Sequence, residues 1–473
     1  MKLYSLIKNL VCRVVGKLDV EICGLYHKDT EVQKNGLFFC IHGTKIDGNT
    51  FVQSAIKNGA VAIVTEQEIH NLFAVSQIVV KNAREAMSLI ACKFYGFPAE
   101  KLKLIGVTGT NGKTTITNVI ANVLNDCGKK CAVVGTNGVI INGQTIQTSM
   151  TTPDPIELQK YMSKMVKAKI EYVCMEVSAH AIDLKKIDGI IFDLVIFTNL
   201  SEDHLDYFKT MDRYFVAKSK LFTRKYAKQA IICTEDDYGK SLSKSINIPF
   251  LTYAINGTSN ACIENVSFDD GKQKFSLDGK TYTTNLLGKF NVLNCTASIL
   301  ALELLGVDQD KIEKSLFQMQ PILGRFNTIV VGGRYFVVDY AHSPDGLKNI
   351  LSACREICNG KLICVFGCGG NREREKRPLM GRIASENADH LVITSDNPRF
   401  EKREEIINEI ASGIEKNNFE IESDRELAIR KAFELSNEND FIVVAGKGAE
   451  NYIDENGTKI HYSDYEVIEK IRR

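Results

Sequence analysis

Features that point to a membrane, a nucleic acid or a structural metal are scarce in this chain of 473 residues. Its best apolar run, IIFDLVIF, is interrupted by Asp193 and falls well short of the roughly 20 residues that span a bilayer. The formal net charge is only +1, whereas nucleic-acid-binding proteins usually carry a basic excess. The 14 cysteines lie singly in apolar segments, without the paired spacing of a zinc site. We therefore expect no membrane or nucleic-acid partner, and reduced cysteines in a cytoplasmic protein.

The N-terminal segment, MKLYSLIKNLVCRVVGK, also lacks the pattern of a secretory signal. Its apolar residues recur at helical spacing, at Leu3, Leu6, Ile7 and Leu10, and Lys8 interrupts any continuous apolar stretch. The spacing predicts an amphipathic helix of the folded protein.

The chain is long enough for about two to four domains. Short β-like runs occupy residues 1–99, and GFPAEKLK is typical of a linker. In residues 100–328 and again in 329–473, apolar strand patterns alternate with helical ones, which predicts mostly parallel sheets covered by helices on both faces. We expect three α/β domains: an N-terminal domain, a central domain of the P-loop type and a C-terminal Rossmann-like domain.

The stretch GVTGTNGKTTITNVI, residues 106–120, resembles a phosphate-binding loop but has Val107 where the usual pattern has a glycine. Gly109 and Gly112 allow positive φ, Lys113 can reach the β- and γ-phosphates, and Thr114 or Thr115 can offer a hydroxyl to Mg²⁺. An apolar strand precedes the loop and a helical pattern follows it, so the helix N-terminus would face the phosphates.

Polar clusters follow two later strand patterns of the same section. Glu176 and Ser178 end one of them, and Asp203, His204 and Asp206 follow the other. Carboxylates and an imidazole at the carboxyl edge of a parallel sheet suit Mg²⁺ and ATP phosphates. Taken alone, the sequence DHLD is equally compatible with an ordinary helix cap.

Together the motifs are specific. In chain order they are TGTNGKTT, TTPDP, MEVSAHA, NLSEDHLDYF, YFVAK, GKFNVLN, GRFN, VDYAHSPDG and DNPR. This set resembles the Mur ligases of peptidoglycan synthesis over about residues 24–464, and that family uses the same unusual form of the loop. The resemblance is strongest to the members that add the third residue of the peptide. It implies an ATP- and Mg²⁺-dependent amide ligase that joins meso-diaminopimelate to UDP-N-acetylmuramoyl-L-alanyl-D-glutamate through an acyl phosphate, as a cytoplasmic monomer.

The resemblance also assigns residues. The catalytic group is Lys113, Glu176, His204 and Lys218. The ATP-binding group is Gly109, Thr110, Asn111, Gly112, Lys113, Thr114, Thr115, Asn294, Arg325, Asp339 and His342. The group for the UDP-linked substrate is Thr30, Thr151, Thr152, Ser178 and Lys186. The magnesium ligands are Thr114, Glu176, His204 and Lys218, the last as a carbamate, an oxygen ligand that suits a hard cation.

The motif DNPR distinguishes family members that take meso-diaminopimelate from those that take L-lysine. The chemistry agrees, because diaminopimelate is lysine with an added carboxylate and Arg399 can grip that carboxylate in bidentate fashion. The predicted amino-acid site comprises Arg372, Asp396, Asn397, Arg399, Gly446 and Glu450. The other basic residue of GCGGNRERE, Arg374, is also interpreted as binding a substrate carboxylate. L-lysine would leave Arg399 buried and unpaired, so discrimination on the order of a thousandfold is expected.

Several positions depart from the family pattern. Lys28, Asp29 and Thr30 stand where Asp-Ser-Arg usually contacts the uridine end, and Ala179 and Leu184 replace a frequent serine and glutamine. Lys186 stands where the family has an arginine; it keeps the positive charge but cannot form the bidentate hydrogen bonds of a guanidinium. A divergent member with another acceptor, a folylpolyglutamate-synthetase-like ligase or the use of L-lysine therefore stays open. A non-catalytic nucleotide switch is the third alternative, and the catalytic group argues against it.

Overall fold

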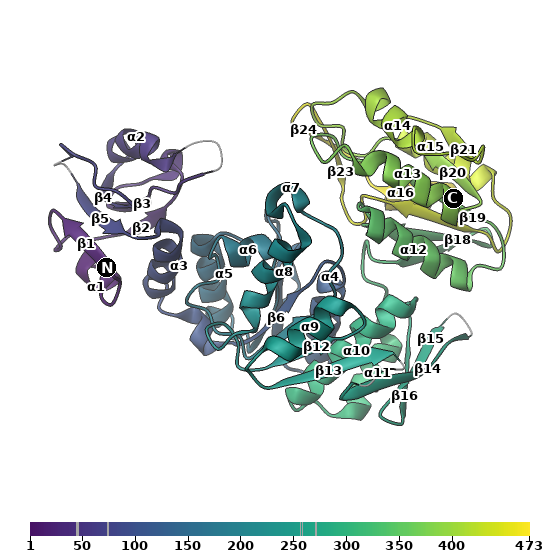
Figure 1. The fold of residues 1–473 in the computed structure, drawn as a ribbon, viewed down its shortest axis with the longest axis horizontal. Coiled ribbons are helices and arrows are strands. Elements are labelled where there is room, and N and C mark those ends of the chain that lie inside the picture. Colours follow the sequence, from purple (N-terminus) through teal and green to yellow (C-terminus); the bar gives the residue numbers. More distant parts are fainter. Residues whose placement is uncertain (44–46, 73–74, 256, 258, 270–271) are drawn as a thin grey trace.

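The computed structural model describes residues 1–43, 47–72, 75–255, 257, 259–269 and 272–473. It contains three α/β lobes, with the middle lobe between the other two (Figure 1). This three-domain α/β architecture confirms the predicted fold class. No helix in these ranges is long and apolar enough to cross a membrane.

The N-terminal lobe is a five-stranded sheet in the order β1-β5-β4-β3-β2, with β1 antiparallel to β5 and the other pairs parallel. Its elements are α1 (Leu3–Ile7), β1 (Cys12–Val15), β2 (Gly24–Tyr26), β3 (Gly36–Phe39), α2 (Val52–Lys57), β4 (Ala60–Thr65), β5 (Ser76–Val80) and α3 (Ala83–Phe94). The predicted N-terminal helix is correct only over α1. The second half of the predicted helix is strand β1 instead, which pairs with β5 at the edge of the sheet. This pairing satisfies backbone N–H and C=O groups that a short exposed helix would leave hydrogen-bonded only to water.

The middle lobe holds an eleven-stranded sheet in the order β16-β15-β14-β13-β12-β11-β6-β10-β7-β8-β9. Its strands are β6 (Lys103–Thr108), β7 (Cys131–Gly135), β8 (Gly138–Ile141), β9 (Gln144–Ile146), β10 (Tyr172–Glu176), β11 (Leu194–Phe197), β12 (Ala230–Cys233), β13 (Phe250–Ile255), β14 (Ala261–Asp269), β15 (Lys272–Leu277) and β16 (Lys280–Thr284). Its helices are α4 (Lys113–Asp126), α5 (Pro155–Lys167), α6 (Ala179–Asp183), α7 (Leu205–Phe208), α8 (Met211–Ser219), α9 (Asp237–Ser245), α10 (Lys289–Leu304) and α11 (Gln309–Gln318).

Strand β6 lies in the parallel centre of this sheet, between β10 and β11. Its alternate residues enter two cores: Ile105 and Val107 pack with α4 on one face, and Leu104 packs on the opposite face. Because β6 is buried on both sides, the loop after it is fixed by a rigid sheet. The antiparallel edge strands β8, β9, β15 and β16 were not predicted.

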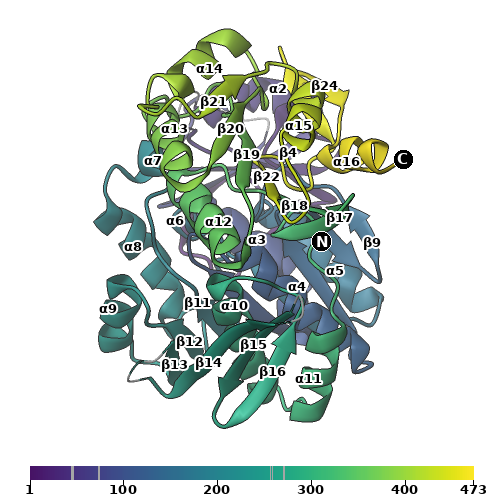
Figure 2. The same cartoon turned by 90° about the vertical axis from the view of Figure 1, so that its right-hand side faces the viewer.

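The C-terminal lobe has a six-stranded sheet in the order β17-β18-β22-β19-β20-β21, and α12 lies between this sheet and the middle lobe (Figure 2). Its strands are β17 (Asn327–Val331), β18 (Arg334–Asp339), β19 (Leu362–Phe366), β20 (His390–Ile393), β21 (Phe419–Ile421), β22 (Phe441–Ala445), and the separate hairpin β23 (Tyr452–Glu455) and β24 (Thr458–His461). Its helices are α12 (Pro344–Ile357), α13 (Lys376–Asn387), α14 (Arg403–Ala411), α15 (Arg425–Glu434) and α16 (Asp464–Arg472). Strand β17 crosses residue 329, so the sheet begins slightly before the predicted domain start.

A fully buried ion pair ties α15 and α16 to this sheet. The guanidinium of Arg425 donates to both carboxylate oxygens of Asp464 at 2.8 and 2.9 Å, and both side chains are 0% exposed. Arg425 also donates to the carbonyl of Ala445 at the end of β22, at 2.9 Å. The carboxylate of Asp464 therefore compensates the buried positive charge of Arg425.

We predict that Asp464→Ala destabilises the C-terminal lobe by about 3–5 kcal/mol, because it leaves a buried guanidinium unpaired. Glu469→Ala is the matched control on the same helix, since Glu469 pairs with Arg472 in solvent at 3.4 Å. The control should change stability by less than about 0.5 kcal/mol. Amide hydrogen exchange of β22 during urea titration measures both, and equal effects would contradict the assignment.

Candidate active site

The phosphate-binding loop joins β6 to α4 and depends on two glycines with positive φ. Gly109 has φ +145° and Gly112 has φ +87°. A Cβ atom at Gly109 would collide with the hydroxyl of Thr198, and one at Gly112 would collide with Oδ1 of Asn294. Thr198, directly after β11, and Asn294 of α10 therefore pack against the loop so closely that only glycine fits at these two positions.

Two lysines converge on one carbonyl oxygen of this loop. Lys113 Nζ donates to the carbonyls of Gly109 at 2.9 Å and Thr110 at 2.8 Å. Lys218 Nζ, from α8, also donates to Gly109 O, at 2.8 Å. Burial lowers the pKa of Lys113, and the carboxylates of Glu176 and Asp203 oppose this shift.

The Lys218 side chain is only 1% exposed and its ammonium lies 4.6 Å from the ring centre of Tyr214. Burial holds the pKa of Lys218 well below its usual range, and the neighbouring charge of Lys113 lowers it further. A buried lysine beside a second cation is favoured in its neutral, nucleophilic form.

Glu176 ends β10 and faces the start of α4. Its Oε1 accepts from Thr114 Oγ1 and from the backbone N–H of Thr136, each at 2.9 Å, and its Oε2 accepts from Thr136 Oγ1 at 3.0 Å. Arg325 reaches the same place, since its Nη2 donates to Thr114 Oγ1 at 3.1 Å. Thr136 was missed by the sequence analysis because no motif singled it out.

His204 stands in the left-handed region, with φ 57°, directly before α7. Its ring lies 4.9 Å from that of His180 in an edge-to-face arrangement, and its Nε2 is 3.4 Å from Asp203. Burial of the ring lowers the pKa of His204 to about 4, against the opposing charge of Asp203. The imidazole is therefore neutral near pH 7 and free to act as an acceptor or ligand.

The other predicted nucleotide residues lie where the C-terminal lobe meets the loop. Asp339 ends β18 and accepts from the N–H groups of Phe326 at 2.7 Å and Ala341 at 2.8 Å, while burial raises its pKa. His342 Nδ1 is 2.8 Å from the carbonyl of Tyr340. Asn294 is buried beneath Gly112 and donates to a neighbouring asparagine on α10, so part of its capacity is already used.

A carboxylate of the C-terminal lobe binds the loop directly. Asp345 Oδ2 accepts from Asn111 Nδ2 at 3.1 Å and from Ser201 Oγ at 2.7 Å. Asp345 lies in the first turn of α12, within the quoted motif VDYAHSPDG, and this motif was the only signal for it. A second link joins Glu373 to the N–H of Asp206, at 3.0 Å.

Most residues predicted for the UDP-linked substrate lie beside Glu176. Thr152 Oγ1 donates to the carbonyl of Glu176 at 2.9 Å and accepts from the N–H of Ser178 at 3.1 Å. Thr151 contacts Thr136 at 3.2 Å. Lys186 is nearly buried, with its Nζ 2.9 Å from Asp154.

Thr30 lies apart from this group, exposed on the short 3-10 turn Asp29–Glu31 of the N-terminal lobe. The two lobes are linked near this turn, because His27 Nε2 is 3.6 Å from Asp154, the partner of Lys186.

The predicted amino-acid residues gather at the carboxyl ends of β20 and β22. Asn397 Nδ2 donates to Glu450 Oε2 at 2.9 Å. Gly446 has φ +113°, and a Cβ atom there would lie 2.5 Å from Asp396 Oδ2, so glycine permits this carboxylate to approach the backbone. Lys447, which the sequence analysis missed, is 0% exposed among them.

The expected state of Arg399 needs correction. Its side chain is 26% exposed, its Nη1 donates to the carbonyl of Gly370 at 2.6 Å, and its Nε is 3.9 Å from Asp454. It would be neither fully buried nor unpaired beside L-lysine, so the reason given for a thousandfold discrimination does not hold. Exposed Arg372 has no hydrogen bond or ion pair with any residue that the structure describes.

The prediction for Arg374, the other arginine of GCGGNRERE, needs correction, and Arg377 lies two residues beyond this motif. Arg374 binds Glu409, and Arg377 is fully buried against Glu401 at 2.9 Å and Glu409 at 2.6 Å. Both guanidinium groups are thus held by carboxylates of the protein. They fix the loop that presents Arg372 and Arg399 instead of gripping a substrate.

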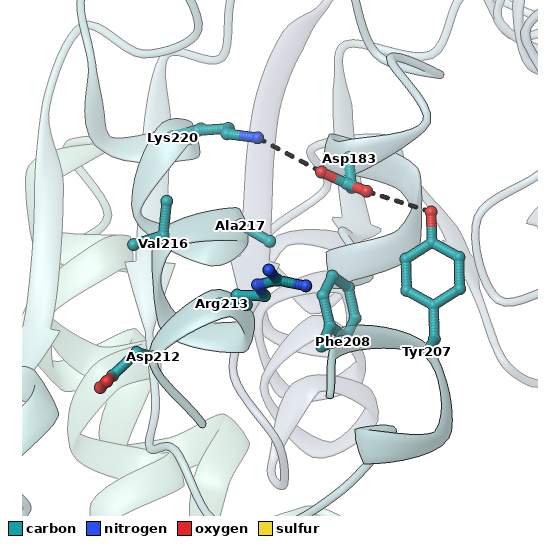
Figure 3. A pocket seen from close by; sticks show the side chains of 8 residues that line it. All are labelled: Asp183, Tyr207, Phe208, Asp212, Arg213, Val216, Ala217 and Lys220. Carbon is teal, nitrogen blue, oxygen red and sulfur yellow. Dashed lines mark hydrogen bonds and ion pairs between the residues drawn. The ribbon is translucent and has the colours of Figure 1, made fainter. Parts of the chain in front are cut away.

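A surface cavity of about 470 Å³ lies along the outer side of α8 (Figure 3). Within it Asp183, the last residue of α6, accepts from Tyr207 at 3.0 Å and from Lys220 at 3.3 Å. These bonds fasten α6, α7 and the end of α8 together. They therefore hold the two elements that carry His204 and Lys218.

A phosphate-binding loop at the carboxyl edge of a parallel sheet, with a second α/β lobe bonded over it, defines a nucleotide-dependent enzyme. Residues 107–302 match the Mur ligase middle domain, residues 324–448 the Mur ligase glutamate ligase domain, and residues 21–95 the catalytic domain of the Mur ligase family. The chain belongs to the Mur ligase family and is an ATP-dependent ligase.

Relatives with one shared name are similar to this chain along its whole length. It is similar to the UDP-N-acetylmuramoyl-L-alanyl-D-glutamate–2,6-diaminopimelate ligase of Clostridium tetani, with 39% identity covering 100% of this chain and 99% of the relative. The ligase of the same name from Aquifex aeolicus is 39% identical over 95% of this chain and 93% of its own. A solved structure with that name superposes with a TM-score of 0.72 at 30% identity, covering 100% and 99% of the two chains.

We predict that Gly112→Ala raises the ATP dissociation constant at least about tenfold, because a Cβ atom there displaces Asn294 and distorts the loop. Gly128→Ala is the control: this glycine also has positive φ, +75°, but open space around it. Both changes cost about 1–2 kcal/mol of backbone strain, so only the first should alter nucleotide binding by calorimetry. Equal affinities in the two variants would refute the packing argument.

Proposed function

We propose that this chain joins meso-diaminopimelate to UDP-N-acetylmuramoyl-L-alanyl-D-glutamate at the expense of ATP, as a cytoplasmic monomer in peptidoglycan precursor synthesis. The observation that carries the proposal is the set of relatives of that name, which match this chain over 95–100% of its length. The polar site described above is consistent with the same activity. The lobes divide the work: the N-terminal lobe binds the uridine end, the middle lobe ATP, and the C-terminal lobe the amino acid.

In the proposed reaction a substrate carboxylate oxygen attacks the γ-phosphorus, and ADP leaves. The amine nitrogen then attacks the carbonyl carbon of the acyl phosphate, loses a proton, and inorganic phosphate leaves. Lys113 and Arg325 lie at the loop, where they would neutralise the charge on the transferred phosphoryl group. Thr110, Asn111 and Thr115 would complete the phosphate cradle.

The ribose and base would lie against Asn294, Asp339 and His342, at the junction of the middle and C-terminal lobes. A carboxylate such as Asp339 accepts hydrogen bonds from ribose hydroxyls. Two of its lone pairs already serve backbone N–H groups, which orient the carboxylate for the ligand.

Magnesium fits the donor set near Thr114. The described residues contain no cluster of three or more His, Cys, Asp or Glu that could hold a metal by itself. Mg²⁺ usually takes one or two carboxylates together with substrate phosphates and water, and Glu176 bonded to Thr114 matches this habit. His204 and a carbamate on Lys218 would add ligands. When bound, Mg²⁺ neutralises charge on the phosphates.

The surroundings of Lys218 support carbamate formation. A neutral amine attacks carbon dioxide and releases a proton, and burial together with the nearby charge of Lys113 lowers the pKa of Lys218, which favours its neutral form. The product carries a negative charge, which the ammonium of Lys113 would stabilise across Gly109.

For the UDP-linked substrate, Thr30 would contact the uridine end, and Thr151, Thr152, Ser178 and Lys186 would hold the peptide end near Glu176. The alternatives, another acceptor or a folylpolyglutamate-type substrate, rest on the departures at Lys28, Leu184 and Lys186. Folylpolyglutamate synthase of Mycobacterium tuberculosis superposes with a TM-score of 0.65 at 15% identity over 76% of this chain and 92% of its own, which supports a shared fold alone.

We predict that Lys218→Ala lowers the ligation rate at least about a hundredfold, since it removes the proposed carbamate. Short-chain carboxylic acids added at high concentration should restore part of the rate. Lys220→Ala, which removes the exposed partner of Asp183, is the control and should gain nothing from such acids. A fully active Lys218→Ala enzyme would rule out this role.

The amine is tested by phosphate release from ATP, with each candidate acceptor paired with diaminopimelate or L-lysine. We expect a preference for diaminopimelate that Arg399→Ala reduces about 10- to 100-fold, the value of one charged hydrogen-bonding pair. Arg403→Ala, which removes a neighbouring ion pair to the same hairpin, should leave the preference unchanged. Turnover with folates alone, or equal use of lysine by the wild type, would refute the proposed function.

A further inference from the structure

Lys447 is enclosed by the residues that we propose for the amino acid. Its side chain is 0% exposed, and Nζ donates to Asn397 Oδ1 at 3.1 Å and to Glu450 Oε2 at 3.2 Å. The same ammonium is 3.8 Å from Asp396 Oδ1 and 5.6 Å from the ring centre of Tyr452. No step of the proposed reaction uses this buried cation.

The first consequence concerns the amide of Asn397. Its Oδ1 accepts both from Lys447 and from the N–H of Asp454, at 2.9 Å, while its Nδ2 donates to Glu450. An ammonium has no acceptor, so the flipped amide would place its NH₂ group against two donors. Lys447 therefore fixes the amide with Nδ2 directed toward Glu450, and the second Nδ2 hydrogen stays available to a ligand carboxylate.

The second consequence concerns Glu450. Its Oε2 accepts from both Asn397 and Lys447, whereas its Oε1 has no hydrogen bond from any residue in the described part of the chain. Holding one oxygen by two donors orients the carboxylate and leaves the other oxygen for a ligand ammonium.

The third consequence is the local charge. Two carboxylates lie near this one ammonium, Asp396 at 3.8 Å and Glu450 at 3.2 Å. Replacing Lys447 with a neutral residue removes one positive charge, so the site becomes one unit more negative. Diaminopimelate carries equal numbers of ammonium and carboxylate groups, whereas L-lysine carries one excess positive charge. A more negative site therefore favours lysine.

We propose that Lys447 is a positioning residue that sets amine specificity: it orients Asn397 and Glu450 and reduces the negative charge of the site, so that a neutral diamino dicarboxylic acid is preferred over a cationic diamino acid. This inference rests on the proposed function. It goes beyond that proposal by naming the group that organises the recognition residues without itself contacting the substrate.

The test compares Lys447→Met with the wild type in the full chain. We expect KM for diaminopimelate to rise at least about tenfold, and the diaminopimelate-to-lysine ratio of kcat/KM to fall at least about tenfold, while KM for ATP changes by less than about twofold. Lys459→Met is the matched control, because Lys459 Nζ lies 4.0 Å from the ring centre of the same Tyr452 but on the exposed strand β24. It should behave as the wild type.

An unchanged ratio in Lys447→Met would overturn the inference, as would an equal loss for both amines and ATP, which indicates a merely structural role. Lys447→Gln keeps a donor to Asn397 without the charge and carries the same ratio test if the methionine variant does not fold. Failure of both variants to fold would also show a structural role and overturn the inference. A wild type that does not use diaminopimelate contradicts the proposed function itself, so the two failures are distinguishable.

Discussion

Two lysine side chains that donate to one carbonyl oxygen impose the constraint on which this site depends. Lys113 and Lys218 approach Gly109 O from α4 and from α8, inside a loop whose glycines exclude any side chain. Like charges so close and so poorly solvated are costly, and the cost is relieved by phosphates, by deprotonation or by conversion of one amine to an anion. The first of these outcomes brings ATP phosphates to the loop, and the last supplies the proposed carbamate ligand for Mg²⁺.

The same constraint bears on how the middle and C-terminal lobes meet around this loop. The middle lobe supplies the cations, but Arg325 and Asp345, which reach Thr114 and Asn111, come from the segment after α11 and from α12. A carboxylate of the C-terminal lobe thus bonds the loop that receives nucleotide. Any rotation of that lobe changes the contacts of the loop, so the position of the amino-acid site and the state of the nucleotide site are physically coupled.

The parts predicted from sequence were those governed by local pattern. The strand, glycine loop and helix at residues 103–126 follow from period-two burial and from the conformational freedom of Gly109 and Gly112. The antiparallel edges β8, β9, β15 and β16 and the strand β1 depend on pairing partners distant in the chain, which periodicity does not reveal. Lys447 and Thr136 were not predicted for a related reason: their contacts are with residues that are distant in the chain. Arg374 was misassigned because the sequence does not show that Glu409 of α14 reaches it.

The two ends of the active site present different charged groups, and this sorts the substrates. The loop brings Lys113 and Arg325 together, which attract phosphates and the carboxylate to be activated. The amino-acid site places the carboxylates of Asp396 and Glu450 around Lys447, and these carboxylates attract ammonium groups. A substrate bearing both kinds of group can satisfy the second site only if its carboxylates find separate donors. Arg399, Arg372 and the amide of Asn397 lie at the rim as such donors, so charge separation within the site itself favours a substrate that is charged at both ends.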